Sequence, residues 1–200
     1  MSEAYQDSFM MKHVLGLARS CQFQEEHGRQ VAKIALGIFD GLIPLHALGK
    51  KERLWLKAGS ILHDIGWQAG GKHHKEAMSI IINSPLLKLP RRERIMIGLI
   101  ARYHRRALPS NKHQYYKSLS KDKKKTIQKL AAIVRIADGL DRAHESLVRS
   151  LECKILKSKV MLRINSGCRQ GLACRSSKLA AKKKSDLFRK VFRRDIVISW

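Results

Sequence analysis

A histidine and an aspartate stand side by side at His63-Asp64, directly after an apolar run from Leu54 to Leu62. Apolar residues recur in this run at helical spacing, so the pair falls at the end of a predicted helix. Adjacent histidine and aspartate side chains can direct a nitrogen and an oxygen at one point, which suits a divalent metal that accepts both ligand types. For an isolated pair, a capped helix end without a metal is the simpler interpretation.

Four further segments with helical spacing each carry a ligand-type residue at or near one end. A single histidine near a helix end is usually a polar surface residue, but five helices that each supply a ligand are much less easily explained by chance. Packing of their apolar faces could gather imidazole nitrogens and two carboxylates, and one carboxylate can bridge the two ions of a two-metal site. The additional positions are His27, His73 or His74, His104 and Asp138.

The elements that must position these residues are predicted from the spacing of apolar side chains. The glycine-rich residues 66–72 are expected to form a mobile loop, and residues 109–120 a polar loop. Toward the C-terminus the pattern changes to short runs that are typical of strands. The predicted helices cover residues 4–20, 24–39, 50–64, 73–83, 91–106, 122–140 and 176–192, and the predicted strands cover 151–156, 160–164 and 196–198.

This pattern predicts a mainly α fold class with a boundary near residue 146. Residues 1–146 are expected to form a helical domain that carries the candidate ligands, and residues 147–200 a small basic α+β unit with β-β-α-β order. The chain has 200 residues, of which 44% are hydrophobic, enough for one good core or for a main domain with a small one.

The composition excludes some classes of protein and favours others. No stretch is long and apolar enough to span a bilayer, and the polar first eleven residues do not form a signal peptide. Because the cysteines form no C-x-x-C pair, neither a zinc knuckle nor a disulfide framework is indicated, and we expect a reducing, cytoplasmic setting. The net charge of +25 attracts polyanions such as nucleic acid, polyphosphate or an anionic membrane. The cysteines are Cys21, Cys153, Cys168 and Cys174.

Together, the candidate ligands and their neighbours resemble a known family. Their order along the chain is similar to that of the HD-domain metal-dependent phosphohydrolases. Four motifs resemble more closely the C-terminal HD domain of exopolyphosphatase/guanosine pentaphosphate phosphatase proteins, and the tail from Lys184 to Phe192 resembles their small last domain. The motifs are Leu62-His63-Asp64-Ile65-Gly66, Lys72-His73-His74-Lys75, Ala101-Arg102-Tyr103-His104-Arg105-Arg106 and Ile136-Ala137-Asp138-Gly139-Leu140-Asp141-Arg142-Ala143-His144.

The resemblance implies an HD-type helical fold and hydrolysis of a phosphate ester or anhydride at one or two divalent metal ions. The ions expected from this mixture of nitrogen and oxygen ligands are manganese, iron, magnesium, nickel or zinc. The expected ligand set is Asp64 as the bridging residue, His27, His63 and Asp138 on one ion, and His73 or His74 with His104 on the second.

Positive side chains near the ligands are expected to neutralise charge on the phosphoryl oxygens, while a bound ion lowers the pKa of the attacking water toward neutrality. Asp141 lies on roughly the same helix face as Asp138, so an outer-shell role in orienting a histidine or Arg142 is expected. A local salt bridge between Asp141 and Arg142 is the alternative. The candidate positive residues are Lys72, Arg102, Arg105 and Arg142.

Two departures from the family's pattern affect this interpretation. Full-length members begin with two actin-like domains that carry the exopolyphosphatase active site, and these 200 residues leave no room for them. The resemblance alone therefore does not imply exopolyphosphatase activity. Glu76 stands where the family often has a histidine, and counting back from Ala77 by analogy with other HD proteins favours His73 over His74 as the ligand.

The basic C-terminal region has two interpretations. A lysine run such as Lys182-Lys183-Lys184 is most often a solvated helix face. The high net charge favours instead a contact with polyphosphate or with the phosphate backbone of a nucleic acid, because few aromatic residues lie nearby for base stacking. The expected partner is a phosphorylated small molecule or polyphosphate, with nucleic acid as a further candidate. The alternative to an enzyme is a non-catalytic or regulatory module that binds a polyanion or a partner protein.

Overall fold

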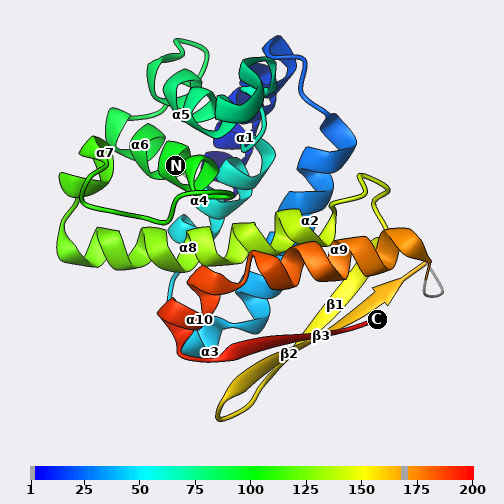
Figure 1. The fold of residues 1–200 in the computed structure, drawn as a ribbon. Coiled ribbons are helices and arrows are strands. Elements are labelled where there is room, and N and C mark those ends of the chain that lie inside the picture. The colour runs from blue at the N-terminus through cyan, green and yellow to red at the C-terminus, as the bar shows by residue number, and fades with distance from the viewer. Residues whose placement is uncertain (1–2, 168–170) are drawn as a thin grey trace.

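A long helix, α8 (Lys121–Leu140), runs through the middle of the fold and contacts helices on both of its sides (Figure 1). The computed structural model describes residues 3–167 and 171–200, so Cys168 and Arg169 lie outside the described residues. The hydroxyl of Ser120 caps α8 by accepting a hydrogen bond from the Lys123 amide at 3.4 Å, which explains why the helix begins there.

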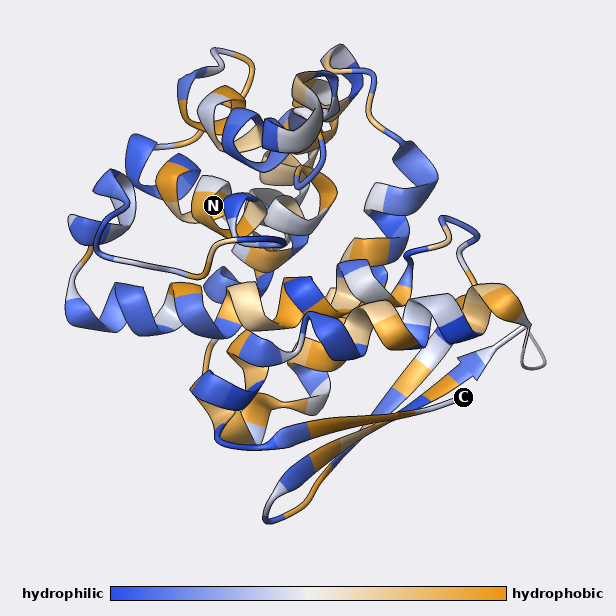
Figure 2. Ribbon diagram, viewed as in Figure 1, coloured by the Kyte–Doolittle hydropathy of each residue, from blue (hydrophilic) through white to orange (hydrophobic). Residues whose placement is uncertain are grey.

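The second half of α8 is buried on all sides. Every residue from Leu130 to Leu140 is buried, whereas the first turns are rich in lysine and hydrophilic (Figure 2). A helix that is apolar all round is stable only inside a core. Arg135 and Asp138 are the charged residues of this buried stretch, and burial of a charge without a partner is costly. Both side chains therefore need partners from neighbouring elements.

The other helices of the first 120 residues form a bundle with α8, and a helical bundle was the predicted architecture. The helices predicted over 50–64 and 91–106 end earlier than expected, at Ile61 and Arg102. His63-Asp64 and His104 therefore lie in turns just beyond the helix ends. The helices are α1 (Glu3–Ser20), α2 (Glu25–Gly41), α3 (Ile43–His46), α4 (Lys50–Ile61), α5 (His73–Asn83), α6 (Arg91–Arg102) and α7 (Gln114–Lys117).

Two segments that were predicted as loops contain short helices. Residues 66–72 include a 3-10 helix, η1 (Trp67–Lys72), with a kink at Gly70, where φ is +54°. Residues 109–120 include α7. Helices of one or two turns carry too few residues for an apolar period, so the sequence pattern missed both of them.

The C-terminal region forms a three-stranded sheet with two helices. Strand β2 (Lys159–Ser166) pairs antiparallel with β1 (Val148–Ile155) and parallel with β3 (Asp195–Ser199). The single helix predicted over 176–192 is wrong, because the chain forms α9 (Leu172–Lys183) and then α10 (Asp186–Phe192).

The break between α9 and α10 has a clear physical cause. The buried guanidinium of Arg135 donates hydrogen bonds to the carbonyl oxygen of Lys184 at 3.3 Å and to a carboxylate oxygen of Asp186 at 2.9 Å. The hydroxyl of Ser185 donates to the carbonyl of Lys182 at 2.7 Å. These bonds hold the junction as a turn, and the sequence pattern alone does not contain them.

The helical bundle and the C-terminal unit share a continuous hydrophobic core. Helices α9 and α10 pack against α8, and strand β1 packs against α2. The structure confirms the predicted fold class, a mainly helical bundle followed by a small α+β unit. The division at residues 146 and 147 stays a prediction. Within the described part of the chain, no helix combines the length and the apolar character needed to cross a membrane.

Candidate metal centre

The predicted ligands lie on five separate elements whose ends meet at one place. His27 is in the first turn of α2, His63 and Asp64 follow the end of α4, and Asp138 is near the end of α8. His73 begins α5, and His104 lies two residues beyond the end of α6. The convergence of these ends produces the grouping that the order of ligands in the sequence predicted.

One group of ligand atoms surrounds His63. Its Nε2 lies 3.4 Å from Oδ2 of Asp64 and 3.9 Å from Oδ1 of Asp138. Nε2 of His27 lies 3.8 Å from the same oxygen of Asp138. Asp138 Oδ1 therefore faces two imidazole nitrogens, one from helix α2 and one from the turn after α4.

A second group surrounds the other oxygen of Asp64. Its Oδ1 lies 3.2 Å from Nε2 of His73 and 3.4 Å from Nε2 of His104. The two carboxylate oxygens of Asp64 therefore face different histidines. Among the described residues, three overlapping sets have ligand atoms within 4.8 Å of one another: His27 with His63 and Asp64, His63 with His104 and Asp138, and Asp64 with His73 and His104.

The outward ring nitrogens of three histidines are held by the same local device. Each Nδ1 bonds to the backbone carbonyl three residues earlier, at 2.7 Å for His63, 2.7 Å for His73 and 2.6 Å for His104. A carbonyl can only accept, so each Nδ1 carries the proton. Each Nε2 is then left with its inward direction fixed, which is the arrangement that metal-binding histidines use.

The fourth histidine, His27, is held by a carboxylate instead. Its Nδ1 lies 2.7 Å from Oδ2 of Asp141, and the other oxygen of Asp141 accepts a hydrogen bond from the Ser146 amide at 3.1 Å. Asp141 is almost completely buried. These contacts agree with the orienting role expected for Asp141, whose carboxylate binds the ring of His27 and the amide of Ser146.

Several inward atoms of the cluster have no hydrogen-bond partner. Nε2 of His27, Nε2 of His63 and Oδ1 of Asp64 are all buried in this way. A buried polar atom without a partner is costly, and a divalent cation satisfies imidazole nitrogen and carboxylate oxygen together. The residues present therefore fit a divalent metal ion.

The charges of the cluster depend strongly on one another. Burial lowers the pKa of His63, but Asp64 and Asp138 outweigh that effect and raise it to about 9. Burial and the charge of His63 together lower the pKa of His104 to about 3. Burial raises the pKa of Asp64, but the adjacent His63 and His73 hold it well below its usual range. At neutral pH the carboxylates are thus ionised, and an ion that binds His63 takes the place of a proton.

His73 and His74 have different surroundings, although they are adjacent. His73 faces Asp64 and His104, whereas His74 belongs to none of the grouped sets in the described chain. The ring of His74 is buried, and burial together with the charges of His73 and Arg102 lowers its pKa to about 4. The structure therefore brings His73, the residue favoured from the sequence, to the cluster.

Of the predicted positive residues, Arg105 lies against a candidate ligand. Its Nη1 lies 3.0 Å from Nε2 of His73, the atom that also faces Asp64. Arg102 is half-buried beside the ring of Tyr103. Lys72 and Arg142 are exposed, at the end of η1 and just after α8.

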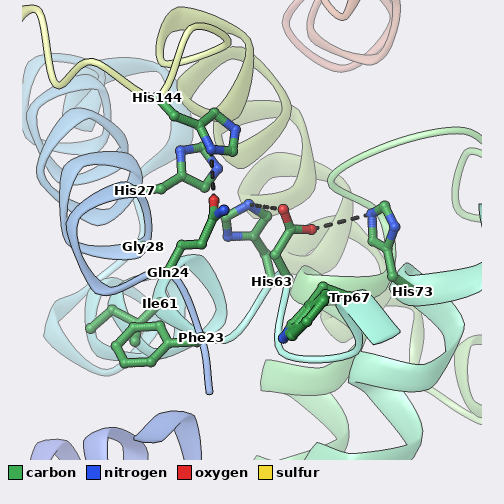
Figure 3. A pocket seen from close by; sticks show the side chains of 10 residues that line it. Phe23, Gln24, His27, Gly28, Ile61, His63, Trp67, His73 and His144 are labelled. Carbon is green, nitrogen blue, oxygen red and sulfur yellow. Dashed lines mark hydrogen bonds and ion pairs between the residues drawn. The ribbon is translucent and has the colours of Figure 1, made fainter. Parts of the chain in front are cut away.

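An open pocket of about 210 Å³ gives access to the cluster (Figure 3). His144, which was not predicted to serve the site, covers one side of it. The ring of His144 stacks on that of His27 with centroids 3.7 Å apart, and its Nδ1 bonds to the side-chain oxygen of Gln24 at 2.7 Å. The lining residues are Phe23, Gln24, His27, Gly28, Ile61, His63, Asp64, Trp67, His73 and His144.

Lys184 is a second residue that the sequence did not assign to the site. Its Nζ contacts Oδ2 of Asp138 directly. Burial raises the pKa of Asp138, but the charges of Lys184 and His104 outweigh it and hold the pKa at about 2. Nothing local distinguishes Lys184 from its lysine neighbours in the sequence, whereas His144 closes one of the quoted motifs.

Comparison with known proteins gives one family. The family described as Ppx/GppA phosphatase, domain III, matches residues 11–182, a range that includes all of the predicted ligands. No curated protein matches the chain.

Proposed function

The chain belongs to the family of Ppx/GppA phosphatase domain III, and on that premise we propose that it is an HD-type metal-dependent phosphohydrolase. Its substrate is a phosphate ester or anhydride, such as a nucleotide or a polyphosphate-like molecule.

One observation carries the proposal: the buried inward atoms of the cluster have no hydrogen-bond partner. These atoms are Nε2 of His27, Nε2 of His63 and Oδ1 of Asp64. The Nδ1 atoms of the two histidines are already held, by Asp141 and by a backbone carbonyl, and Asp64 directly follows His63 in the chain. A structural polar network satisfies its own atoms. This cluster instead leaves open the atoms that a cation binds, which supports a metal site.

The distances support an assignment of ligands to two ions. His27, His63 and Asp138 would hold one ion with Oδ2 of Asp64, and His73 and His104 would hold a second with Oδ1 of Asp64. Manganese, iron, magnesium, nickel and zinc are all compatible with such donors. When bound, a divalent ion supplies a nucleophile at neutral pH and polarises a phosphoryl oxygen.

The chain's own residues prepare the site before any ligand arrives. Asp141 keeps the proton of His27 on Nδ1, and backbone carbonyls do the same for three other histidines. The guanidinium of Arg105 lies beside His73, where it can bind an anionic phosphoryl oxygen. The side chains of Phe23 and Trp67 form part of the pocket wall, and Trp67 is half-exposed there.

The first experiment measures metal content by plasma mass spectrometry on protein purified without an affinity tag. We expect about one or two ions per chain in the wild type. Asp64→Ala should lose them because Asp64 faces both groups of histidines. Asp122→Ala, which removes a carboxylate that is 93% exposed, is the matched control and should retain the metal.

Phosphate release from nucleotides, phosphodiesters and polyphosphate then tests the reaction. Turnover that is abolished in Asp64→Ala and kept in Asp122→Ala supports the enzyme. If the wild type retains no metal even after incubation with manganese or iron, the hydrolase proposal is wrong.

The second candidate is a non-catalytic or regulatory module that binds a polyanion, and one observation favours it. Helices α9 and α10 carry exposed basic residues on their outer face. The two acidic residues of positions 171–200, Asp186 and Asp195, are each paired with an arginine. For such a module, Asp64→Ala should leave polyanion binding nearly unchanged.

A further inference from the structure

Lys184 connects the C-terminal unit to the candidate metal centre. Its ammonium group contacts Oδ2 of Asp138, while Oδ1 of the same carboxylate lies 3.8 Å from His27 and 3.9 Å from His63. The two oxygens of Asp138 therefore have separate partners. One oxygen is held by a residue of the chain's last 20 positions, and the other faces the ligand histidines.

Close helix packing brings Lys184 to this place. Gly139 follows Asp138 on α8, and a Cβ atom at Gly139 would lie 2.5 Å from the Cα of Ala181 on α9. Real Cβ atoms do not approach backbone so closely, so the two helices meet here only because residue 139 is a glycine. Lys184 stands one turn after Ala181, at the end of α9. The contact point of the helices thus determines where the lysine lies.

Arg135 fixes the backbone on the other side of the lysine. This residue is 4% exposed and lies one turn before Asp138 on α8. Its guanidinium binds the Lys184 carbonyl and the Asp186 carboxylate, and it also donates to the carbonyl of Tyr103 at 3.3 Å. Tyr103 precedes the ligand His104. One buried arginine therefore ties the α9–α10 junction to the turn that carries a ligand.

We propose that Lys184 is a positioning residue of the metal centre. It holds Oδ2 of Asp138, so that Oδ1 stays directed at the ion. The inference rests on the proposed metal site and extends it to the C-terminal unit. The lysine acts through Asp138 and touches no substrate.

Two physical effects of Lys184 on metal binding have opposite signs. As a cation it repels a nearby divalent ion, and its removal would then tighten binding. As a hydrogen-bond donor it fixes the orientation of a ligand, and loss of such a partner typically weakens metal affinity about 10- to 100-fold. The Asp138 carboxylate offsets this repulsion because it pairs directly with the ammonium group, and Asp138 Oδ2 has no other described hydrogen-bond partner. Orientation is therefore the larger effect.

The test titrates metal-free protein with Mn²⁺ alone and measures affinity by isothermal calorimetry. Lys184→Met should bind Mn²⁺ about 10-fold or more weakly than the wild type. Lys184→Arg keeps a donor and should recover most of the affinity. Lys183→Met removes the same charge from an exposed neighbour on α9 and should bind like the wild type.

Each outcome has a defined meaning. Tighter binding by Lys184→Met, or unchanged binding, overturns the positioning role while the metal site itself stands. Equal weakening in Lys184→Met and Lys184→Arg also overturns it, because rescue by a second donor is the signature of orientation. If the wild type binds neither Mn²⁺ nor Fe²⁺, both this inference and the proposed function fail.

Discussion

His46 is a buried histidine outside the candidate metal centre, and its hydrogen bonds require the neutral ring. It is 1% exposed. Its Nε2 donates to the Phe39 carbonyl at 2.8 Å, and its Nδ1 accepts from the Leu48 amide at 2.9 Å. A second proton on the ring would face the Leu48 donor. Burial lowers the pKa of His46 and the nearby Lys129 lowers it further, while the hydrogen bond to the Phe39 carbonyl and the charge of Asp40 oppose the shift.

The first prediction concerns the pH dependence of stability. The pKa of His46 is lower in the folded chain than its value of about 6.5 in the unfolded chain. At pH values between these two pKa values, the unfolded state therefore binds more protons than the folded state. The stabilisation is therefore full above about pH 6.5 and is lost as pH falls through the folded value. Between pH 7 and pH 5, the free energy of unfolding measured in urea should fall less in His46→Gln than in the wild type. The difference corresponds to the binding of at most about one proton.

His13→Gln serves as the control for this pH series. His13 lies on α1 and bonds to the Leu86 carbonyl at an exposed position. The pH slope of His46→Gln is compared with the slope of this variant, which also lacks one histidine. A wild-type slope that persists in His46→Gln would assign the effect to other groups.

Residue types and order were enough to name candidate ligands, because histidine and aspartate have a chemical signature of their own. Histidines and aspartates at helix ends are few, so His27, His63, Asp64, His104 and Asp138 could be named from the sequence. The choice between His73 and His74 depends on the direction in which each ring points, and the structure favours His73 because its ring lies near Asp64. Lys184 could not be found, because its function comes from a contact with a residue 46 positions away.

At the scale of elements, the turn after α4 must approach the first turn of α5 very closely. A Cβ atom at Gly66 would lie 2.5 Å from the Ala77 amide nitrogen and 2.5 Å from the His73 carbonyl oxygen. Both are backbone atoms and cannot rotate away. Gly66 therefore permits the approach that places His73 3.2 Å from Asp64.

The second prediction is that Gly66→Ala separates these two ligands. Overpacking of this kind typically costs about 1–3 kcal/mol of stability, which urea unfolding measures. Mn²⁺ affinity should fall about 10-fold or more, because His73 and Asp64 move apart. The control is Gly71→Ala in the same segment, whose Cβ would meet only the flexible end of Arg106 at 3.4 Å. Equal Mn²⁺ affinity in the two variants would show that the close approach has no role in binding.

Helices could be predicted where their apolar period is long, but an end that is set by a tertiary contact could not. The long helix α8 was placed within one residue because its later turns are apolar on all sides. The break between α9 and α10 was missed because it depends on Arg135, which lies on a different helix. Local pattern contains the period of a helix, but a tertiary hydrogen bond can set where the helix stops.

At the scale of the whole molecule, a net charge of +25 attracts polyanions from any direction. The question is whether one face of the molecule concentrates that attraction. Helices α9 and α10 lie along one side of the fold, next to the sheet (Figure 1). Their exposed basic residues include Lys178, Lys182, Lys183 and Lys190. The first turns of α8 offer a comparison, because they carry the lysines Lys121, Lys123, Lys124 and Lys125.

The last prediction distinguishes a local binding face from net charge alone. Replacing Lys178, Lys182, Lys183 and Lys190 by glutamine should weaken polyphosphate binding and make its salt dependence shallower, because each phosphate contact on a single-stranded polyanion contributes about −0.7 to the slope of log K against log[salt]. Four lost contacts would change that slope by about 3. The control replaces Lys121, Lys123, Lys124 and Lys125 on α8, so the net charge changes equally while the C-terminal face stays intact. Affinity is measured from 50 to 300 mM salt by fluorescence anisotropy. If both variants lose affinity equally, the attraction belongs to the whole charge of the molecule, and the C-terminal face is a solvated surface without a binding role.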